Sequence, residues 1–402
     1  MKRPDGASFH LFKAFVAIIP RRLEKGWLGN IMLQRSEKAS VRDLEREDLP
    51  AVAQLFQKTF RKSEHTPPSL VAHLHEILFA HPWQDSDLPS KILVSESGKL
   101  QGFIGVFPGR LELGGQSLRA AFAGSLMVEN PEANPLAGAR LIRAFLAGPQ
   151  DLSLTETANA TALGMWQKLS LPFDVGYSLN WLRVFRPATT AVRLMEKNVS
   201  AARVFKPMAS VADMIAANTR LSALRFQPQS RTPRIRFREA TRAEFRDAAL
   251  ILKDQFPLRP QWDIPSLDWL IDQASQKRQL GTPFWRVGET RTGGLAGAYA
   301  YFGRAGSLGW LLQALCSPDA AGDLVEDLFD HADAAGCAGL RGAGHPWLTP
   351  ELITRKTSFH GRAFYLAHAR DQALLEPIRS GRALISGLAG ESWMRLIGDS
   401  FD

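Results

Sequence analysis

An internal repeat restricts this chain to a fold with two similar halves. Val41–Phe56 reads as a short strand, a turn and a helix. Phe237–Leu252 repeats this layout 196 positions later without a gap, and Arg238 takes the place of Arg42. Self-similarity at a fixed spacing indicates that one structural unit occurs twice.

The elements that follow the first helix also recur in the same order. Each half continues with a predicted β-hairpin, a third strand, a helix and a further strand. This order predicts a mixed α/β fold in both halves. The ranges are Ile92–Glu96, Leu100–Phe107, Arg119–Glu129, Leu136–Leu146 and Leu152–Thr155 in the first half, and Phe284–Glu289, Gly294–Phe302, Ser307–Cys316, Asp319–Ala335 and Gly339–Arg341 in the second.

The repeat divides the chain into four expected parts. Between the halves, helical patterns near Ala188–Asn198 and Val211–Leu221 precede the polar, proline-flanked run before Pro233. The parts are residues 1–40, a basic extension with a short apolar helix; 41–186, the first α/β domain; 187–233, a helical linker; and 234–402, a second, degenerate α/β domain.

The charge and cysteine content limit the partners. The 402 residues carry a net charge of +9, which favours acidic or phosphorylated partners. Residues 1–40 hold eight Lys/Arg and three Asp/Glu, and the small surplus elsewhere argues against a dedicated nucleic-acid surface. Cys316 and Cys337 stand apart, with no Cys/His cluster, so we expect buried reduced thiols, no metal site and a cytoplasmic protein.

The N-terminal extension contains an apolar stretch at Phe9–Ile19. Its longest unbroken apolar run, Ala14–Ile19, is far shorter than the roughly 18 residues that cross a bilayer. Pro20 and a basic pair follow instead of a signal-peptide cleavage site. Two interpretations stay open: a helix packed on the body of the protein, or weak peripheral contact of residues 9–25 with an anionic membrane surface.

Four stretches of the first half carry a family resemblance, and they span about 145 residues from Val41 to Arg186. They are Val41–Phe56, Lys91–Phe107, Ser125–Pro131 and Asn159–Leu169. Together they resemble the GNAT superfamily of acyl-CoA N-acyltransferases, and Arg234–Arg370 resembles the same fold more faintly. The resemblance implies a tandem pair of GNAT-like α/β domains that transfers an acyl group, most simply acetyl, from acyl-CoA to an amine acceptor.

The resemblance also implies a set of coenzyme A contacts. The family binds the pyrophosphate at a loop before a helix, where backbone N–H groups and the helix dipole attract an anion. The strand before that loop orients the thioester, and a later helix adds a contact. The matching residues are Met127 and Val128 on the strand, Asn134, Ala137, Gly138, Ala139 and Arg140 on the loop, and Asn159 at the later helix.

The implied catalytic groups depart from the family pattern. Trp166 stands where the family often has a tyrosine that protonates the coenzyme A thiolate, and an indole cannot supply that proton. Tyr177 is the nearest substitute in the sequence. As general base, Glu129 is the first candidate and Glu156 the second. The first half has no cysteine to carry the acyl group, so we expect direct attack by the amine.

The second half departs further from the family. Its corresponding loop, Ser317–Gly322, is followed by Asp323 and contains Asp319, and these carboxylates would repel a pyrophosphate. We therefore expect this half to have lost coenzyme A binding and to shape an acceptor cleft. Two alternatives remain: a tRNA-dependent aminoacyl transferase of tandem architecture, and a non-catalytic binding protein on a degenerate GNAT scaffold.

Overall fold

The structure is a computed structural model, and it describes residues 39–167, 173–195, 206–217, 233–361 and 363–401. The predicted apolar helix at residues 9–19 and the membrane contact at residues 9–25 lie outside this part of the chain. Within the described ranges, no helix is both long and apolar enough to cross a membrane.

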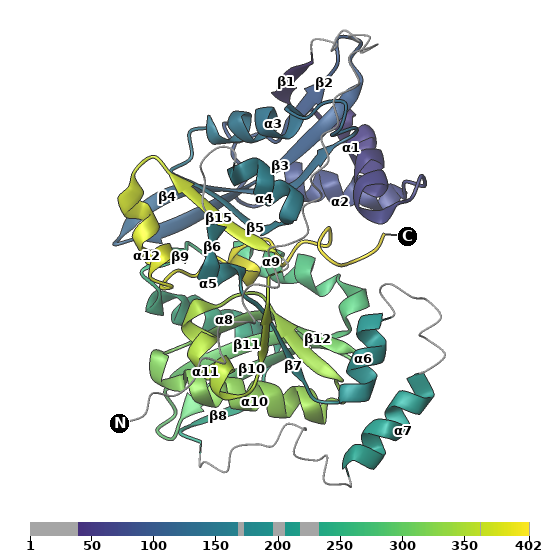
Figure 1. The fold of residues 1–402 in the computed structure, drawn as a ribbon. Helices are drawn as coiled ribbons and strands as arrows, with labels where there is room; N and C mark the ends of the chain where they lie inside the picture. The colour runs from purple at the N-terminus through teal and green to yellow at the C-terminus, as the bar shows by residue number, and fades with distance from the viewer. Residues whose placement is uncertain (1–38, 168–172, 196–205, 218–232, 362, 402) are drawn as a thin grey trace, which may run out of the picture. The chain divides into compact units, whose positions relative to one another are not determined.

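Two mixed β-sheets with the same strand order organise the described chain (Figure 1). In each sheet, one central pair of strands is parallel and the other described neighbours are antiparallel. The first sheet has the order β1 (Ser40–Asp43), β2 (Lys91–Val94), β3 (Leu100–Leu113), β4 (Gln116–Val128), β5 (Leu152–Ala158), β15 (Phe364–Ala369) and β6 (Phe173–Asp174), with β9 (Leu258–Pro260) beside β3. The second has the order β8 (Ile235–Glu239), β10 (Thr282–Thr290), β11 (Leu295–Gly303), β12 (Leu308–Cys316), β13 (Gly339–Gly342), β7 (Asn180–Val184) and β14 (Ser358–His360).

Helices cover the faces of these sheets. Because alternate residues of a strand point to opposite faces, Phe103 and Phe107 of β3 pack with α1 and α2, whereas Ile104 and Val106 pack with α3. The helices are α1 (Leu49–Phe56), α2 (Pro68–Phe79), α3 (Ala137–Leu146), α4 (Ala160–Gln167), α5 (Val175–Ser178), α6 (Pro187–Met195), α7 (Lys206–Ala217), α8 (Arg242–Leu252), α9 (Ile264–Ser275), α10 (Ala321–Ala334), α11 (Thr349–Thr354) and α12 (Glu376–Arg379).

The two sheets exchange one strand each. β15 comes from the second half of the sequence, yet it lies between β5 and β6 of the first sheet. β7 comes from the first half, yet it lies between β13 and β14 of the second sheet. The division between the sheets is therefore not a division of the sequence, and the domain boundaries inferred from the repeat stay a prediction.

Matching ion pairs at the start of each half support the sequence repeat. Arg42 donates to both carboxylate oxygens of Asp48 at 2.8 Å. Arg238 Nη1 donates to Glu244 Oε1 at 2.7 Å, and both of these residues lie 196 positions after their counterparts. Such exposed pairs contribute little to stability, roughly 0–1 kcal/mol. Their value here is that they confirm the register of the repeat.

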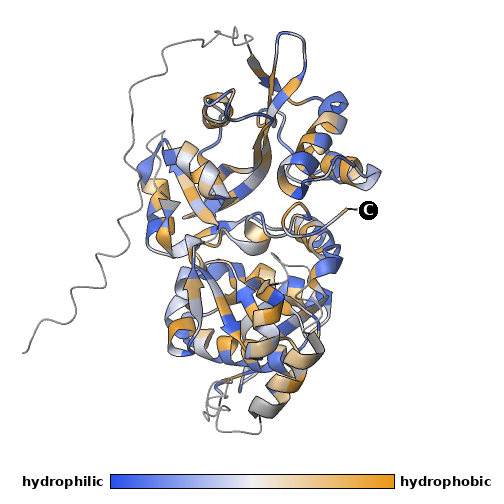
Figure 2. Cartoon of the chain, turned by 45° about the vertical axis from the view of Figure 1, so that its right-hand side comes forward, coloured by the Kyte–Doolittle hydropathy of each residue, from blue (hydrophilic) through white to orange (hydrophobic). Residues whose placement is uncertain are grey.

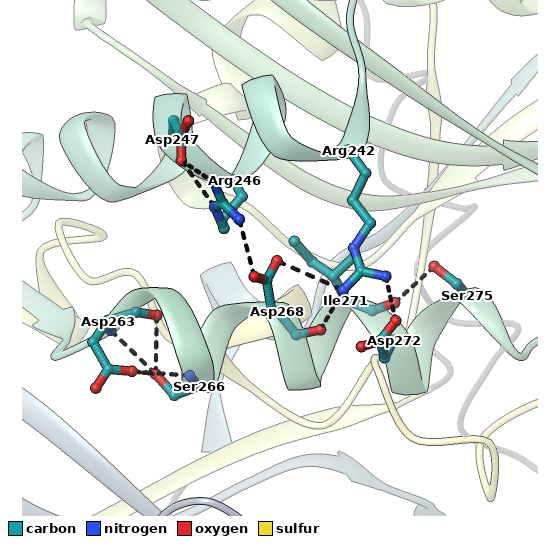
Figure 3. A network of polar contacts seen from close by, with 9 residues as sticks. All are labelled: Arg242, Arg246, Asp247, Asp263, Ser266, Asp268, Ile271, Asp272 and Ser275. Carbon is teal, nitrogen blue, oxygen red and sulfur yellow. Dashed lines mark hydrogen bonds and ion pairs between the residues drawn. The ribbon is translucent and has the colours of Figure 1, made fainter.

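Charged side chains join α8 to α9 in the second half (Figure 3). Arg246 Nη1 donates to Asp268 Oδ2 at 3.0 Å, and Arg242 Nη2 donates to the Asp268 carbonyl at 2.8 Å. Asp263 caps α9 by accepting the Ser266 N–H at 2.9 Å. These contacts hold the two helices together on one face of the sheet.

A continuous apolar core includes residues of both sheets and of the C-terminal segment, residues 383–401. Ile92 of the first sheet, Leu312 of the second and Trp393 of the C-terminal segment belong to one buried cluster. The helices around it carry both apolar and polar residues, orange and blue in Figure 2, as amphipathic elements do. Burial of the C-terminal segment brings its side chains next to the site described below.

His81 gives a pH-dependent test of this core. Its ring lies 4.7 Å from the Trp269 ring and its Nδ1 accepts the Trp83 N–H at 3.0 Å, while burial lowers its pKa to about 4. As pH falls from 6.5, the unfolded chain binds this proton before the folded chain does, so stability is lost. When the pH is lowered from 7.5 to 5, we expect the free energy of unfolding of His81→Asn to rise by about 1–2 kcal/mol relative to that of the wild type. Urea unfolding at both pH values measures this change, and a constant difference would contradict it.

Candidate active site

The central parallel strands of the first sheet separate after a short stretch of pairing. Ala120–Phe122 of β4 pairs with Leu152–Leu154 of β5, and the ladder ends there. Just beyond, Ser125 has a φ of 53° and forms a β-bulge opposite Ile104. A bulge increases local twist and interrupts the ladder. The strands therefore open a notch, whose β4 wall is residues 123–126.

The notch contains a cavity of about 320 Å³. Its walls come from β4, β5, α4, the π-helical continuation of α1 and the C-terminal segment. They include Phe60, Ser125, Thr157, Ala162, Trp166 and Ile397. The notch is thus an apolar cleft between β4 and β5, and α4 lies along one side of it.

A second cavity, the inner cavity, measures about 400 Å³ and is lined by residues of both sheets. Glu156 comes from β5, while Trp310 and Arg341 come from β12 and β13. Thr157 and Ile397 line the notch as well as the inner cavity. The two cavities are therefore adjacent, with these residues in a wall that both share.

Glu156 anchors the C-terminal segment. Its carboxylate accepts the N–H groups of Gly387, Glu391 and Ser392 at 3.2, 2.5 and 3.2 Å, and the Ser392 hydroxyl at 2.8 Å. Burial raises its pKa, and these hydrogen bonds oppose that rise. With four donors directed at it, this carboxylate has little capacity to accept a proton from a substrate.

Glu391 is a second buried carboxyl group close to the cavities, although it lines neither of them, and no pattern in the sequence points to it. Thr157 Oγ1 donates to Glu391 Oε2 at 2.5 Å, which sets the carboxyl beside a residue common to both cavities. Glu391 Oε1 has no hydrogen-bond partner among the described residues, and a Cβ on Gly124 would lie 3.6 Å from it. Burial, with the nearby Glu156, raises the pKa of Glu391 to about 8.

Two basic residues hold the C-terminal segment in place. The ammonium of Lys277 is fully buried and donates to the carbonyls of Ser392 and Met394 at 2.7 and 3.1 Å. Burial lowers the pKa of Lys277 to about 7. Arg61 donates to the carbonyls of Leu396 and Asp399 at 3.0 and 2.8 Å. These contacts hold the segment in which Ile397 lines both cavities and Glu391 contacts Thr157.

The strand residues predicted from the resemblance lie at the far end of β4. Met127 and Val128 pair with Phe103 and Gly102, whereas the notch is lined by the residues just before them. Glu129 is about one third exposed, and its carboxylate is 3.0 Å from Lys99 Nζ. It does not line the notch or the inner cavity as the described residues define them. Its role as general base stays a prediction.

The predicted pyrophosphate loop leads into α3. Ala137 and Gly138 are buried, and a Cβ on Gly138 would lie 2.2 Å from Met165 Sδ of α4. Glycine at this position therefore serves the packing of α3 against α4. Ala139 and Asn134 are partly exposed, and Arg140 donates to the Ala39 carbonyl at 2.5 Å. The loop thus presents the start of a ten-residue helix to solvent.

Two predicted residues do line the notch. Asn159 Oδ1 accepts the Ala162 N–H at 2.8 Å, so this side chain caps α4 at the notch wall. Trp166 is 3% exposed, lines the other end of the wall, and packs edge-on against Phe145 with 6.0 Å between ring centres. Trp166 therefore fills space here that a smaller residue would leave open.

Tyr177 lines the inner cavity, but its hydroxyl is already bonded on both sides. It donates to the Ala383 carbonyl at 2.6 Å and accepts the Ala383 N–H at 2.9 Å. Burial raises its pKa well above the usual value. The hydroxyl therefore joins α5 to the C-terminal segment at Ala383.

Tyr177→Phe distinguishes a structural hydroxyl from a catalytic one. The substitution leaves two buried backbone groups of Ala383 without a partner, so we expect the free energy of unfolding to fall by about 1–3 kcal/mol. Urea unfolding measures this loss, and kcat is measured in parallel. A large drop in kcat with unchanged stability would instead support Tyr177 as the general acid.

In the second sheet, the C-terminal segment occupies the position that corresponds to the notch. β12 has its own bulge at Leu312, and the Leu388 N–H donates to Gln313 Oε1 at 2.8 Å beside it. Gly387, with a φ of 73°, lies so close that a Cβ would be 2.3 Å from the Leu312 carbonyl oxygen. Asp323 accepts the N–H groups of Arg234 and Ile235 at 2.8 and 3.0 Å.

The described residues contain no cluster suited to a metal ion and no exposed thiol. No group of three or more His, Cys, Asp or Glu side chains is arranged there to hold a metal ion. Cys316 and Cys337 are free and buried, and burial raises the pKa of both thiols.

Comparison with known proteins places this fold. No protein-family model matches the sequence, and no curated protein matches it. A solved structure from Enterococcus faecalis, described as a "Probable N-Acyltransferase", aligns with a TM-score of 0.53 at 11% identity over 84% of this chain and 75% of its own. A GCN5-related N-acetyltransferase from Anabaena variabilis aligns with a TM-score of 0.53 at 9% identity over 83% and 73%.

These likenesses and the two matching sheets agree on the architecture. The chain has the fold of the GNAT N-acyltransferases, as the sequence resemblance predicted. The mixed α/β class and the occurrence of two related sheets are confirmed with it. Identities of 11% and 9% establish the fold and leave the reaction to be argued from the site.

Proposed function

We propose that the protein is an acyl-CoA N-acyltransferase that binds the acyl-CoA in the notch and the amine acceptor in the inner cavity. One observation carries the proposal: the two cavities share Thr157 and Ile397, and Glu391 lies beside that junction. A thioester in the notch and an amine in the inner cavity would meet there. The GNAT fold and its N-acyltransferase neighbours support the same reaction class.

The first half is the better candidate for coenzyme A. Its notch is open, whereas residues 387 and 388 pack against the matching bulge of the second sheet. At the start of α3, the proposed pyrophosphate contacts are Asn134, Ala139 and Arg140, supported by the backbone N–H groups and dipole of the helix. In the second half, Asp323 at the matching helix start accepts the N–H groups of Arg234 and Ile235, and its carboxylate would disfavour a pyrophosphate there.

Glu391 would act first as the proton acceptor and then as the proton donor of the transfer. The acceptor ammonium first loses one proton to solvent, and its nitrogen then attacks the thioester carbonyl carbon. As the C–N bond forms and the C–S bond breaks, the second nitrogen-bound proton passes to the Glu391 carboxylate. Because its pKa of about 8 is close to that of a thiol, Glu391 can return this proton to the departing thiolate. Trp166 then needs no acid role.

Direct titration tests the proposed donor. Purified protein is titrated calorimetrically with coenzyme A, acetyl-CoA and acyl-CoAs of increasing chain length. We expect saturable binding of at least one acyl-CoA with a Kd below about 1 mM, and an acetyl preference if the notch holds only a short acyl group. Absence of binding across the series would overturn the acyltransferase proposal.

A further inference from the structure

The inner cavity contains hydrogen-bond donors that have no acceptor among the described residues. Trp181 is fully buried, and both Trp181 and Trp310 line the cavity. Neither indole Nε1 has a hydrogen-bond partner among the described residues. An indole N–H can only donate, and a buried donor without an acceptor is unfavourable. A ligand that brings acceptor oxygens into the cavity would satisfy both groups.

Positive charge lines the same walls. The Arg341 guanidinium lies over the Trp310 ring, 5.0 Å from its centre, and both residues line the cavity. Lys277 also lines it, and two of its three ammonium N–H groups go to the carbonyls of Ser392 and Met394. When Lys277 is protonated, its third N–H has no acceptor among the described residues, and its pKa of about 7 makes Arg341 the steadier positive charge of this wall.

Two acceptor side chains of these walls, Glu156 and Tyr177, are already committed. Glu156 receives four hydrogen bonds from the C-terminal segment. The Tyr177 hydroxyl is bonded to both backbone groups of Ala383. The wall therefore offers a ligand donors and positive charge, and it offers few acceptors in return.

We propose that the inner cavity selects a small amine that carries a carboxylate group, such as an amino acid. The carboxylate would lie toward Arg341 and Trp310, since a guanidinium and an indole N–H together suit a planar anion with two acceptor oxygens. The amine would lie at the Thr157 end, beside the thioester. This inference rests on the proposed acyl transfer and names the acceptor class of that same site.

Matched pairs of acceptors test the carboxylate directly. Each common L-amino acid, β-alanine and γ-aminobutyrate is compared with its primary amide and with the amine that lacks the carboxyl group, using the acyl-CoA that binds best. We expect the active acceptors to be carboxylates, with kcat/KM at least about 100-fold above that of the matched amide. Equal rates for acid and amide, or a preference for amines without a carboxylate, would overturn the proposal.

Three variants locate the carboxylate in the cavity. Arg341→Gln is expected to raise the acceptor KM about 100-fold and to remove the preference for acid over amide. Trp310→Phe keeps a ring beneath Arg341 but removes the N–H, and a rise of about 10-fold is expected. Trp285→Phe is the matched control, because Trp285 packs on Phe245 outside this cavity. Acyl-CoA affinity should stay unchanged in all three.

The outcomes separate this inference from the proposed function. If acyl-CoA binds but no carboxylate amine reacts, the acceptor class is wrong while the donor site stands. If no acyl-CoA binds, the transferase proposal itself fails. Calorimetric titration with the same amino acids in the absence of acyl-CoA still tests the cavity. Binding that Arg341→Gln weakens supports the inference, and no binding contradicts it.

Discussion

Replacing Ala162 with tryptophan will weaken acyl-CoA binding at least about 100-fold, or about 2.7 kcal/mol. Ala162 lies on α4 and its side chain lines the notch, whose cavity measures about 320 Å³. An indole at this position would occupy the space between β4 and β5 that the acyl-pantetheine arm needs. The Ala162 N–H would still donate to Asn159, so the cap of α4 is retained. Calorimetric titration with the best acyl-CoA measures the loss.

Thr161→Trp is the matched control for this experiment. Thr161 is the preceding residue of α4, is exposed, and does not line the notch. We expect near wild-type affinity in this variant. Ala139→Glu probes the predicted pyrophosphate loop separately, because it adds a negative charge at the start of α3, and at least about a 10-fold loss of affinity is expected. Wild-type affinity in Ala162→Trp would place acyl-CoA outside the notch.

Replacing Glu391 with glutamine will lower kcat by about 100- to 1000-fold, in the range that a general base contributes. Glutamine keeps the size of the side chain and a carbonyl oxygen that accepts the Thr157 hydroxyl, but it cannot take up the proton. Acyl-CoA affinity is expected to stay near wild type, so the loss should fall on kcat. Steady-state kinetics with saturating acyl-CoA measures it.

The pH profile gives the Glu391 variant a second readout. Burial keeps the carboxyl protonated below pH 8, so wild-type kcat should rise through pH 8 as the base form appears. In the Glu391→Gln variant, the rise of kcat through pH 8 should be absent. Only the ionisation of the acceptor amine should then shape the pH profile. Glu129→Gln, measured in parallel, decides between the two carboxyl groups. A loss confined to Glu129→Gln would contradict the assignment of Glu391.

The local elements were predictable because their signals are local. The short strand and the helix expected within Val41–Phe56 form as β1 and α1, and α1 buries five apolar residues. The strand contacts expected from the resemblance, Met127 and Val128, lie just beyond the β4 residues that line the notch, and their role stays a prediction. The bulge that sets its position requires Ser125 at a φ of 53°, and a serine gives no sign of that conformation in sequence.

The proposed catalytic site depends on contacts that no local pattern could reveal. Glu391 lies in a segment without helical or strand periodicity, and the Glu156 carboxylate that binds its N–H is 235 positions away. Lys277 reads as a surface lysine in the sequence, yet it is 2% exposed and binds two carbonyls of the same segment. Only the folded chain brings these groups to the notch.

Because β7 and β15 are exchanged, each half of the sequence supplies an interior strand to the sheet of the other half. If the chain were cut between residues 187 and 233, each fragment would carry a strand that belongs in the interior of its partner's sheet. Separate fragments would expose long unpaired edges at β5 and β13, and neither would form a complete sheet alone. Mixed together, they should reassemble as one non-covalent unit. Loss of either half would therefore remove an interior strand from the sheet of the half that remains.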